Sequence, residues 1–243
     1  MKILSISTSQ MAGGVGLVVD GDSIGEIFFS TRKTHSRRLM THLLFLLKEA
    51  GMSWDDIDHI AVDQGPGSFT GLRIGVATAK GLCVSMGYGL VGVSSLDIMA
   101  EQALLFSGLI LPMIDARKGQ VYGALYRNDG KGRIEKLHPP SALYPDQVCS
   151  VVQKAMDNAD HSVLVAGDGF SLCEKQLRTC LKDRLVLAPA HYGLVRPAMV
   201  GVVAHGRLLS GVSPVPCHEL LPEYCRLSEA EEKLLHNTGA AAQ

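Results

Sequence analysis

The stretch DQGPGSFTGLRIG, residues 63–75, joins a short apolar run at residues 59–62 to a helix-length segment at residues 71–86. That segment carries three glycines, the last of them Gly81, and each glycine inside a helix costs about 1 kcal/mol relative to alanine. On a helical projection one narrow stripe is nearly free of side chains: Gly71, Gly75, Thr78 and Leu82. We predict a glycine loop followed by a helix that another helix can approach closely.

The loop itself has two interpretations. Gly65 and Gly67, placed after a strand and before a helix, are similar to the start of a dinucleotide fingerprint, in which backbone amides approach a pyrophosphate. However, the next glycine comes one residue late for G-x-G-x-x-G, and no acidic residue ends the following apolar run at residues 90–93. A P-loop would need Lys and then Ser or Thr where Leu72 and Arg73 stand. The spacing favours the second interpretation, a tight turn whose glycines satisfy backbone geometry.

Composition limits the classes of function. With 243 residues, 47% hydrophobic and 19% charged, the chain is an ordinary globular sequence with enough apolar residues for a sizeable core. A formal net charge of −1 argues against a protein that holds nucleic acid unaided, because phosphate neutralisation dominates such binding. No apolar run approaches the roughly 18 residues of a membrane span, and the first run, residues 1–6, is too short for a signal peptide. We expect a cytoplasmic protein without membrane contact, whose six scattered cysteines stay reduced.

The predicted elements occur twice in the same order. In the first half we expect strands at residues 2–8, 13–20, 24–31, 59–63 and 89–93, and helices at residues 36–50, 71–86 and 95–106. In the second half we expect strands at residues 109–114, 120–127, 133–137, 162–166 and 185–188, and helices at residues 145–156, 170–181 and 198–209. This repetition predicts an α/β protein built from a duplicated βββαβα unit.

The repeat also predicts the domain organisation. The first lobe would be residues 1–107 and the second lobe residues 108–211. A partly packed C-terminal segment, residues 212–243, would follow, with a short helix at residues 228–235 and a disordered end at residues 239–243.

The predicted helix at residues 36–50 is apolar on more than one side. One stripe consists of Leu39, Leu43, Leu46, Leu47 and Ala50. Met40 and Leu44 widen this stripe, and Phe45 lies on the far side. A helix that is apolar this far round is either deeply buried or covered by a partner.

Several short segments carry a family resemblance. They are His35-Ser36 with Leu39, the run at residues 65–75, AKGL at 79–82, VSSL at 93–96, DAR at 115–117 with Val121-Tyr122, GDG at 167–169, and PEYCRLSEAE at 222–231. Together they resemble the TsaB family, also called YeaZ, over nearly the whole chain. The duplicated unit is similar to the ASKHA superfamily, which has a two-lobed fold of the actin-like, ribonuclease H-like kind.

The resemblance implies a role in forming N6-threonylcarbamoyladenosine, at the adenosine adjacent to the anticodon of tRNAs that read codons beginning with A. In that system TsaD transfers the threonylcarbamoyl group, and the TsaB member is a non-catalytic dimerisation and scaffold subunit. The implied partners are TsaD, bound as a heterodimer through the first-lobe helices, and the ATPase TsaE. Alone, the chain would form a homodimer, and tRNA would be reached only through the complex. No cofactor is expected to bind catalytically, although ATP or ADP could lie at the interface with the partner subunits.

The resemblance places the partner surface on the first two helices of the first lobe. The expected interface residues are Leu39, His42, Leu43, Leu46, Leu47, Gly71, Arg73, Gly75, Thr78, Lys80 and Leu82. In this prediction the leucines and the glycine stripe hold the partner, and the two basic residues adjust the electrostatics.

A second set of residues would mark a vestigial nucleotide cleft: Ser7, Thr8, Gly65, Gly67 and Asp115. The family pattern reads I-D-T where this chain has Ser7 in the middle position, and serine cannot supply the carboxylate that a hard cation prefers. Asp115 has two open roles, as a second phosphate-site carboxylate or, in the interpretation we favour, as a cap of the turn with Arg117.

The alternative class of function is an enzyme, either an ATP-dependent ASKHA phosphotransferase or a peptidase-like hydrolase. Among the nine histidines, His35 and His42 are two helical turns apart, too far to share a metal without further ligands. We therefore predict no metal site and no catalytic residues, and we favour the scaffold over the enzyme.

Overall fold

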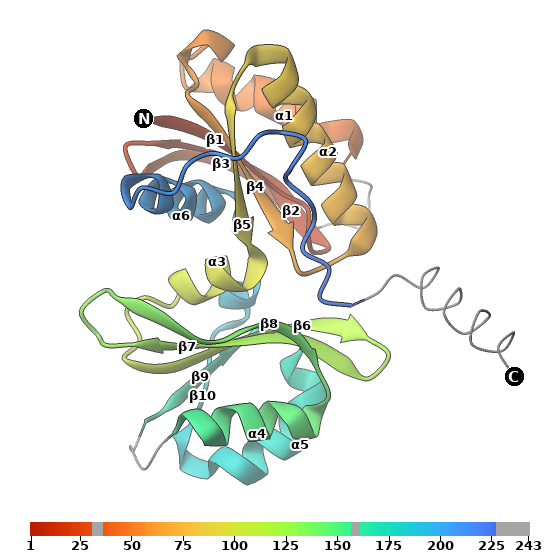
Figure 1. The fold of residues 1–243 in the computed structure, drawn as a ribbon, viewed down its shortest axis with the longest axis vertical. Helices are drawn as coiled ribbons and strands as arrows, with labels where there is room; N and C mark the ends of the chain where they lie inside the picture. Colours follow the sequence, from red (N-terminus) through yellow and green to blue (C-terminus); the bar gives the residue numbers. More distant parts are fainter. Residues whose placement is uncertain (31–35, 157–160, 227–243) are drawn as a thin grey trace, which may run out of the picture.

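The computed structural model of the chain describes residues 1–30, 36–156 and 161–226. These residues form two lobes, one above the other in Figure 1, and each lobe is built on a five-stranded mixed sheet. Among the described helices, none has both the length and the apolar character of a membrane span. The helix predicted at residues 228–235 and the disordered end predicted at residues 239–243 lie outside the described residues.

The two sheets have the same strand order and the same strand directions. The first sheet has the order β3-β2-β1-β4-β5, and the second, in the corresponding sense, β8-β7-β6-β9-β10. The first sheet consists of β1 (Lys2–Ser7), β2 (Ala12–Val19), β3 (Asp22–Ser30), β4 (His59–Gly65) and β5 (Gly89–Ser94). The second sheet consists of β6 (Gly108–Arg117), β7 (Gln120–Asn128), β8 (Ile134–Leu143), β9 (Val163–Ala166) and β10 (Leu185–Leu187). In each sheet the first three strands of the chain form antiparallel pairs. The fourth strand pairs parallel with the first, and the fifth pairs parallel with the fourth. The predicted duplicated βββαβα fold is confirmed.

Six α-helices cover the sheets in the described part of the chain. They are α1 (Ser36–Glu49), α2 (Phe69–Met86), α3 (Ser95–Glu101), α4 (Pro145–Ala155), α5 (Phe170–Leu181) and α6 (Pro197–Leu209), with short 3-10 helices at Trp54–Asp56, Lys182–Arg184 and Ala190–Gly193. Sequence signals set the ends of α2: the Gly71 amide donates to the Ser68 hydroxyl oxygen at 3.3 Å, and Gly87 ends the helix with a φ of 76°.

The helices divide into three layers (Figure 1). Helices α1 and α2 cover the outer face of the first sheet, and α4 and α5 cover the outer face of the second. Between the sheets, α3 and α6 share one continuous core with the inner faces of both, including Ile3, Val93, Met99, Ile110 and Val200. Because β1 and β6 are covered on both sides, they are almost continuously buried apolar runs.

Helix α6 belongs to the first lobe, which corrects the predicted lobe boundary at residue 211. It packs across β1, β2 and β3, and a Cβ atom added at Gly201 would lie 2.7 Å from Cγ2 of Val18. The chain therefore passes from the second lobe back to the first before α6 begins, and the C-terminal segment continues over the first lobe from there (Figure 1).

Candidate partner-binding surface and interlobe cleft

The glycine loop and the first turns of α2 pack against the end of β1. The Thr8 hydroxyl donates to the Gly71 carbonyl at 2.7 Å. A Cβ atom at Gly71 would lie 2.0 Å from the Thr8 carbonyl oxygen, and one at Gly75 would lie 2.4 Å from the Thr8 hydroxyl oxygen. One at Gly67 would lie 2.3 Å from the Ser9 carbonyl oxygen. The prediction that this stripe admits another helix is therefore wrong, because these glycines allow α2 and its loop to lie against the chain's own β1.

The predicted interface leucines also lie inside their own lobe. The leucines with no more than 6% exposure are Leu39, Leu43, Leu46, Leu47 and Leu82. They pack with the outer face of the first sheet, including Leu4 and Leu17. This corrects their assignment as contact residues, since a side chain in the core of one lobe is not available to a partner.

Of the predicted interface residues, those that reach the surface at least in part are His42, Arg73, Thr78 and Lys80. The His42 ring lies 5.3 Å from the ring of Phe29, and burial, followed by the charge of Arg38, lowers the pKa of His42. Both effects favour the neutral form of the His42 ring.

Basic residues of α2 are held by the C-terminal segment. The Arg73 guanidinium lies 3.8 Å from the centre of the Phe69 ring, and its Nε donates to the Tyr224 hydroxyl at 3.1 Å. The Lys80 ammonium donates to the His218 carbonyl at 3.5 Å. Both cations therefore contact the C-terminal segment, and Arg73 remains exposed.

Helices α1 and α2 expose several apolar residues, among charged ones such as Lys48 and Arg73. We call the outer apolar face the set Met40, Leu44 and Phe45 of α1 with Ala77, Gly81 and Val84 of α2, all of them exposed. The exposed fractions of Leu44, Phe45 and Val84 are 52%, 55% and 76%. A Cβ atom at Gly81 would meet nothing within 4 Å, so this glycine, unlike Gly75, faces open space. The extra apolar residues of the helix at 36–50 were the sequence signal for this face.

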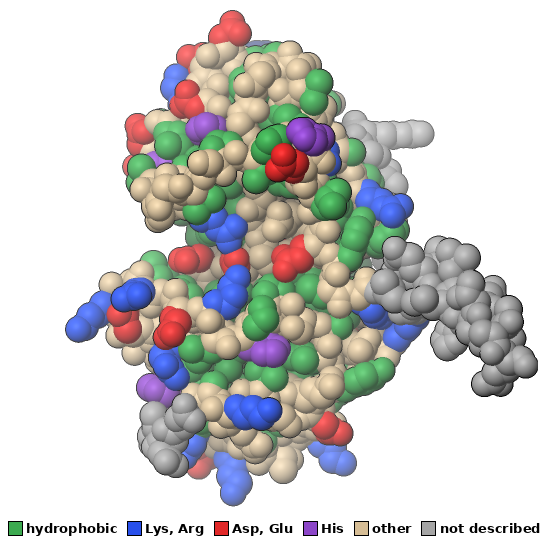
Figure 2. Space-filling model, viewed as in Figure 1, with side chains coloured by type: hydrophobic (Ala, Val, Ile, Leu, Met, Phe, Trp, Pro, Cys, Tyr) green, Lys and Arg blue, Asp and Glu red, His purple; other side chains and the backbone are tan. Residues whose placement is uncertain are grey.

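A cleft of about 610 Å³ opens between the lobes where β1 and β6 end. Of the residues predicted for a vestigial nucleotide cleft, Gly67 and Asp115 line it. Ser7, Thr8 and Gly65 are buried behind it and do not line it, which corrects their assignment. On the face shown in Figure 2, acidic and basic side chains face each other across the furrow between the lobes.

Asp115 caps the turn between β6 and β7. Its carboxylate accepts from the Arg117 amide at 2.7 Å and lies 3.2 Å from the Arg117 guanidinium. The Asp115 amide donates to the Asp168 carboxylate at 2.9 Å. These contacts match the turn-cap role, the one that the sequence favoured.

Ser7 is bound to a buried carboxylate. Its hydroxyl donates to Oδ2 of Asp63 at 2.8 Å, while Oδ1 accepts from the Ser95 hydroxyl at 2.5 Å and from the Gly65 amide at 3.1 Å. Burial raises the pKa of Asp63, and these hydrogen bonds act in the opposite direction. Ser7 thus completes the hydrogen bonding of Asp63 inside the lobe.

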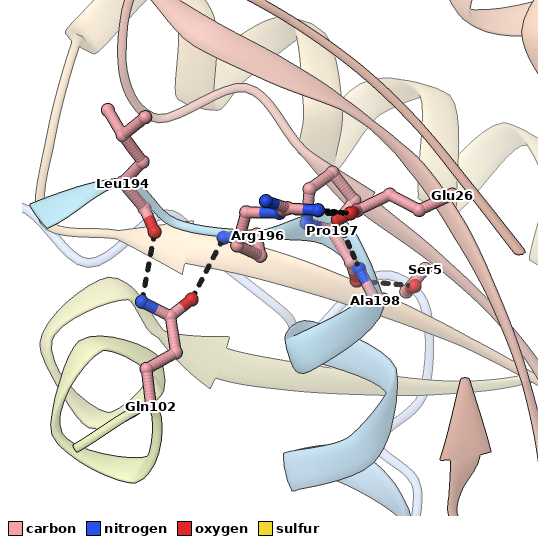
Figure 3. Close-up of polar contacts among 7 residues, drawn as sticks. All are labelled: Ser5, Glu26, Gln102, Leu194, Arg196, Pro197 and Ala198. Atoms are coloured by element: carbon pink, nitrogen blue, oxygen red, sulfur yellow. Dashed lines mark hydrogen bonds and ion pairs between the residues drawn. The ribbon is translucent and has the colours of Figure 1, made fainter. Parts of the chain in front are cut away.

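Sequence analysis missed the residues that hold the chain where it passes from the second lobe back to the first. Gln102, the residue that follows α3, donates to the Leu194 carbonyl at 3.0 Å and accepts from the Arg196 amide at 3.2 Å (Figure 3). Glu26 of β3 accepts from Nε of Arg196 at 2.9 Å and from the Ala198 amide at 3.0 Å, where α6 begins. These partners are 92 to 172 residues apart in the chain, so no local pattern could have revealed them.

An ion cluster centred on the buried Asp97 links the lobes. Asp97 of α3 is 9% exposed, and it accepts from the Tyr126 hydroxyl at 2.6 Å and pairs with Lys136 at 2.7 Å and with Arg207 of α6 at 2.5 Å. In residues 1–30, 36–156 and 161–226, no three His, Cys, Asp or Glu side chains group closely enough to hold a metal ion.

The duplicated sheets and the cleft between them define the class of the fold: a two-lobed α/β protein of the ASKHA type.

A family model described as "TsaD: tRNA N6-adenosine threonylcarbamoyltransferase" matches residues 26–234. The tRNA threonylcarbamoyladenosine biosynthesis protein TsaB of Bacillus subtilis is 34% identical over 238 residues, covering 98% of this chain and 99% of that protein. TsaB of Escherichia coli is 31% identical over 239 residues, covering 96% and 98%. The structure of YeaZ from Pseudomonas aeruginosa superposes with a TM-score of 0.77 at 26% identity, covering 92% and 99%. The chain therefore belongs to the TsaB family, also called YeaZ.

Proposed function

We propose that this chain takes part in the biosynthesis of N6-threonylcarbamoyladenosine in tRNA as a non-catalytic scaffold subunit that pairs with TsaD. Family membership supports the pathway, because the relatives that match nearly the whole chain are named for this biosynthesis. Within the proposal, TsaE joins the pair, the chain alone forms a homodimer, and tRNA binds through the complex in the cytoplasm. ATP or ADP would lie at the interface with the partner subunits.

The outer apolar face is the observation that carries the scaffold role. Exposed apolar side chains that cluster on two adjacent helices mark a protein–protein contact more often than a solvated surface. Leu44 and Phe45 offer large apolar anchors, and Gly81 leaves room for a partner helix to come close. Arg73 and Lys80, at the edge of this face, would contribute to the orientation of the partner.

The chemistry at the end of β1 supports a subunit without catalysis of its own. Where the family pattern has an aspartate, Ser7 supplies a hydroxyl that is already bound to Asp63. Asp115, at the end of the equivalent strand of the second lobe, already caps a turn with Arg117. Ser7 has no carboxylate, and the Asp115 carboxylate already binds Arg117. Both facts disfavour the phosphotransferase alternative, which needs a carboxylate for phosphate or metal chemistry.

The test is tRNA threonylcarbamoylation by TsaD and TsaE with preformed threonylcarbamoyl-AMP, with and without this chain. We expect product formation to depend on the chain and to be lost with Leu44→Glu, which puts a charge on the outer apolar face. Leu105→Glu is the matched control, because Leu105 is 98% exposed and lies outside that face. Product formation that is independent of the chain, or equally sensitive to both substitutions, would contradict the proposal.

A further inference from the structure

Two cysteines of the second lobe lie in direct contact. Sγ of Cys149 on α4 and Sγ of Cys180 on α5 are 2.8 Å apart, and neither is in a disulfide. A disulfide bond holds its sulfurs about 2.05 Å apart, so bond formation requires a movement of less than about 1 Å. Both side chains are partly exposed, which gives an oxidant in solution access to them.

The geometry points to a redox modification site: we propose that Cys149 and Cys180 form a reversible disulfide when the protein meets a peroxide. A first thiol is oxidised by hydrogen peroxide to a sulfenic acid, with release of one water. The second thiol attacks that sulfur, the S–S bond forms, and the sulfenic oxygen leaves as a second water. A dithiol such as dithiothreitol reduces the bond and becomes oxidised in turn. This inference is independent of the proposed scaffold role.

The bond would join the two helices that cover the second sheet. Val148 and Val152 of α4 and Leu177 and Leu181 of α5 already share one core cluster under these helices. The disulfide would close a loop of about 30 residues, which restricts the unfolded chain more than the folded one. We therefore expect the oxidised protein to melt roughly 5 °C higher than the reduced protein.

Burial slows any step in which the Cys149 thiolate is the reacting group. It raises the pKa of the Cys149 thiol to about 12, with further contributions from the neighbouring Cys180, Cys173 and Asp146. The thiolate is the reacting form, and its fraction grows with pH everywhere below the pKa. Oxidation should therefore be slow at pH 7 and faster at pH 9.

The experiment treats the reduced full-length chain with hydrogen peroxide and maps disulfides by mass spectrometry of a non-reduced digest. We expect a cross-link between the Cys149 and Cys180 peptides, a mass loss of about 2 Da from the two hydrogens removed, and reversal by dithiothreitol. Cys180→Ser should abolish the cross-link and its melting shift. Cys173→Ser, on the same helix at a buried position, is the matched control and should retain both.

Two outcomes would overturn the proposal. In one, both thiols remain open to alkylation after denaturation, although a peroxide-treated reference dithiol is fully oxidised. In the other, the cross-link joins different cysteines. Because Cys180→Ser and Cys173→Ser both keep a residue of similar size, the comparison remains informative even if each lowers stability slightly.

Discussion

Helices α1 and α2 of the first lobe and helices α4 and α5 of the second occupy equivalent places in the duplicated fold, but their outer surfaces differ. The first pair exposes Met40, Leu44, Phe45 and Val84. The corresponding exposed positions of the second pair are mostly polar, with Leu172 as an exception: Gln147, Ser150, Gln153, Lys175, Arg178 and Thr179. In Figure 2 charged side chains project from the lower end of the molecule, where the second lobe lies.

This difference separates what the fold needs from what an interface needs. Both helix pairs bury an inner apolar stripe against their sheet, as any covering helix must. The first pair exposes more apolar side chains on the outside than the second pair, which exposes Leu172. The outer apolar face is therefore the feature that the fold alone does not explain.

The largest expected effect contrasts the two faces of α2. Gly75→Leu should lower the free energy of unfolding by about 3 kcal/mol or more, because its side chain would overlap Thr8. Gly81→Leu should leave the stability unchanged or raise it by up to about 1 kcal/mol, since leucine is the better helix former and meets open space. Urea unfolding of both variants measures this. Equal destabilisation by the two substitutions would contradict the assignment of inner and outer faces.

A second prediction contrasts the ends of the first strands of the two lobes. β1 ends at the buried Ser7, whereas β6 carries Asp115 on the cleft. Ser7→Asp should cost about 3 kcal/mol, because a second carboxylate would be buried against Asp63. Adding Asp63→Asn should restore most of that loss, and a double-mutant cycle of unfolding free energies tests the coupling. Additive effects of the two substitutions would show that the side chains do not interact.

A smaller effect concerns pH. The pKa of the Asp63 carboxyl group is raised in the folded protein. The protonated carboxyl group therefore stabilises the fold fully at a pH below the pKa of the unfolded chain, near 3.8, and this stabilisation is lost as the pH rises through the pKa of the folded protein. The melting temperature of Asp63→Asn minus that of the unsubstituted chain should therefore increase as the pH rises above about 4. Melting curves between pH 4 and pH 8 measure the difference. A difference that stays constant over this range would mean that the carboxyl group does not titrate as described.

The sequence predicted the order of elements well because each element has a local signal. Apolar periodicity and end signals such as Ser68 and Gly87 placed the strands and helices. The sequence predicted a helix at residues 198–209, but not which sheet it covers, so α6 was placed in the wrong lobe. That information lies in long-range contacts such as Gly201 against Val18.

Most of the residues that the sequence named for the partner surface lie in the core of their own lobe. The glycine stripe correctly indicated a close approach, but the approaching partner is Thr8, more than 60 residues earlier in the chain. For α1, a helix apolar on several sides gives no local sign of which side meets the sheet, so the core leucines were taken for the contact. Met40, Leu44 and Phe45, which the same pattern contained, are the exposed ones.

The most direct test of the outer apolar face is the affinity of purified TsaD for three forms of this chain, measured by isothermal titration calorimetry. The forms are the unsubstituted chain, Phe45→Glu on α1, and Gln153→Glu at an exposed position of the equivalent helix α4. We predict that Phe45→Glu weakens binding about 30-fold or more, the loss of about 2 kcal/mol typical of a central contact, while Gln153→Glu leaves it unchanged. Equal affinities for all three forms would contradict the account.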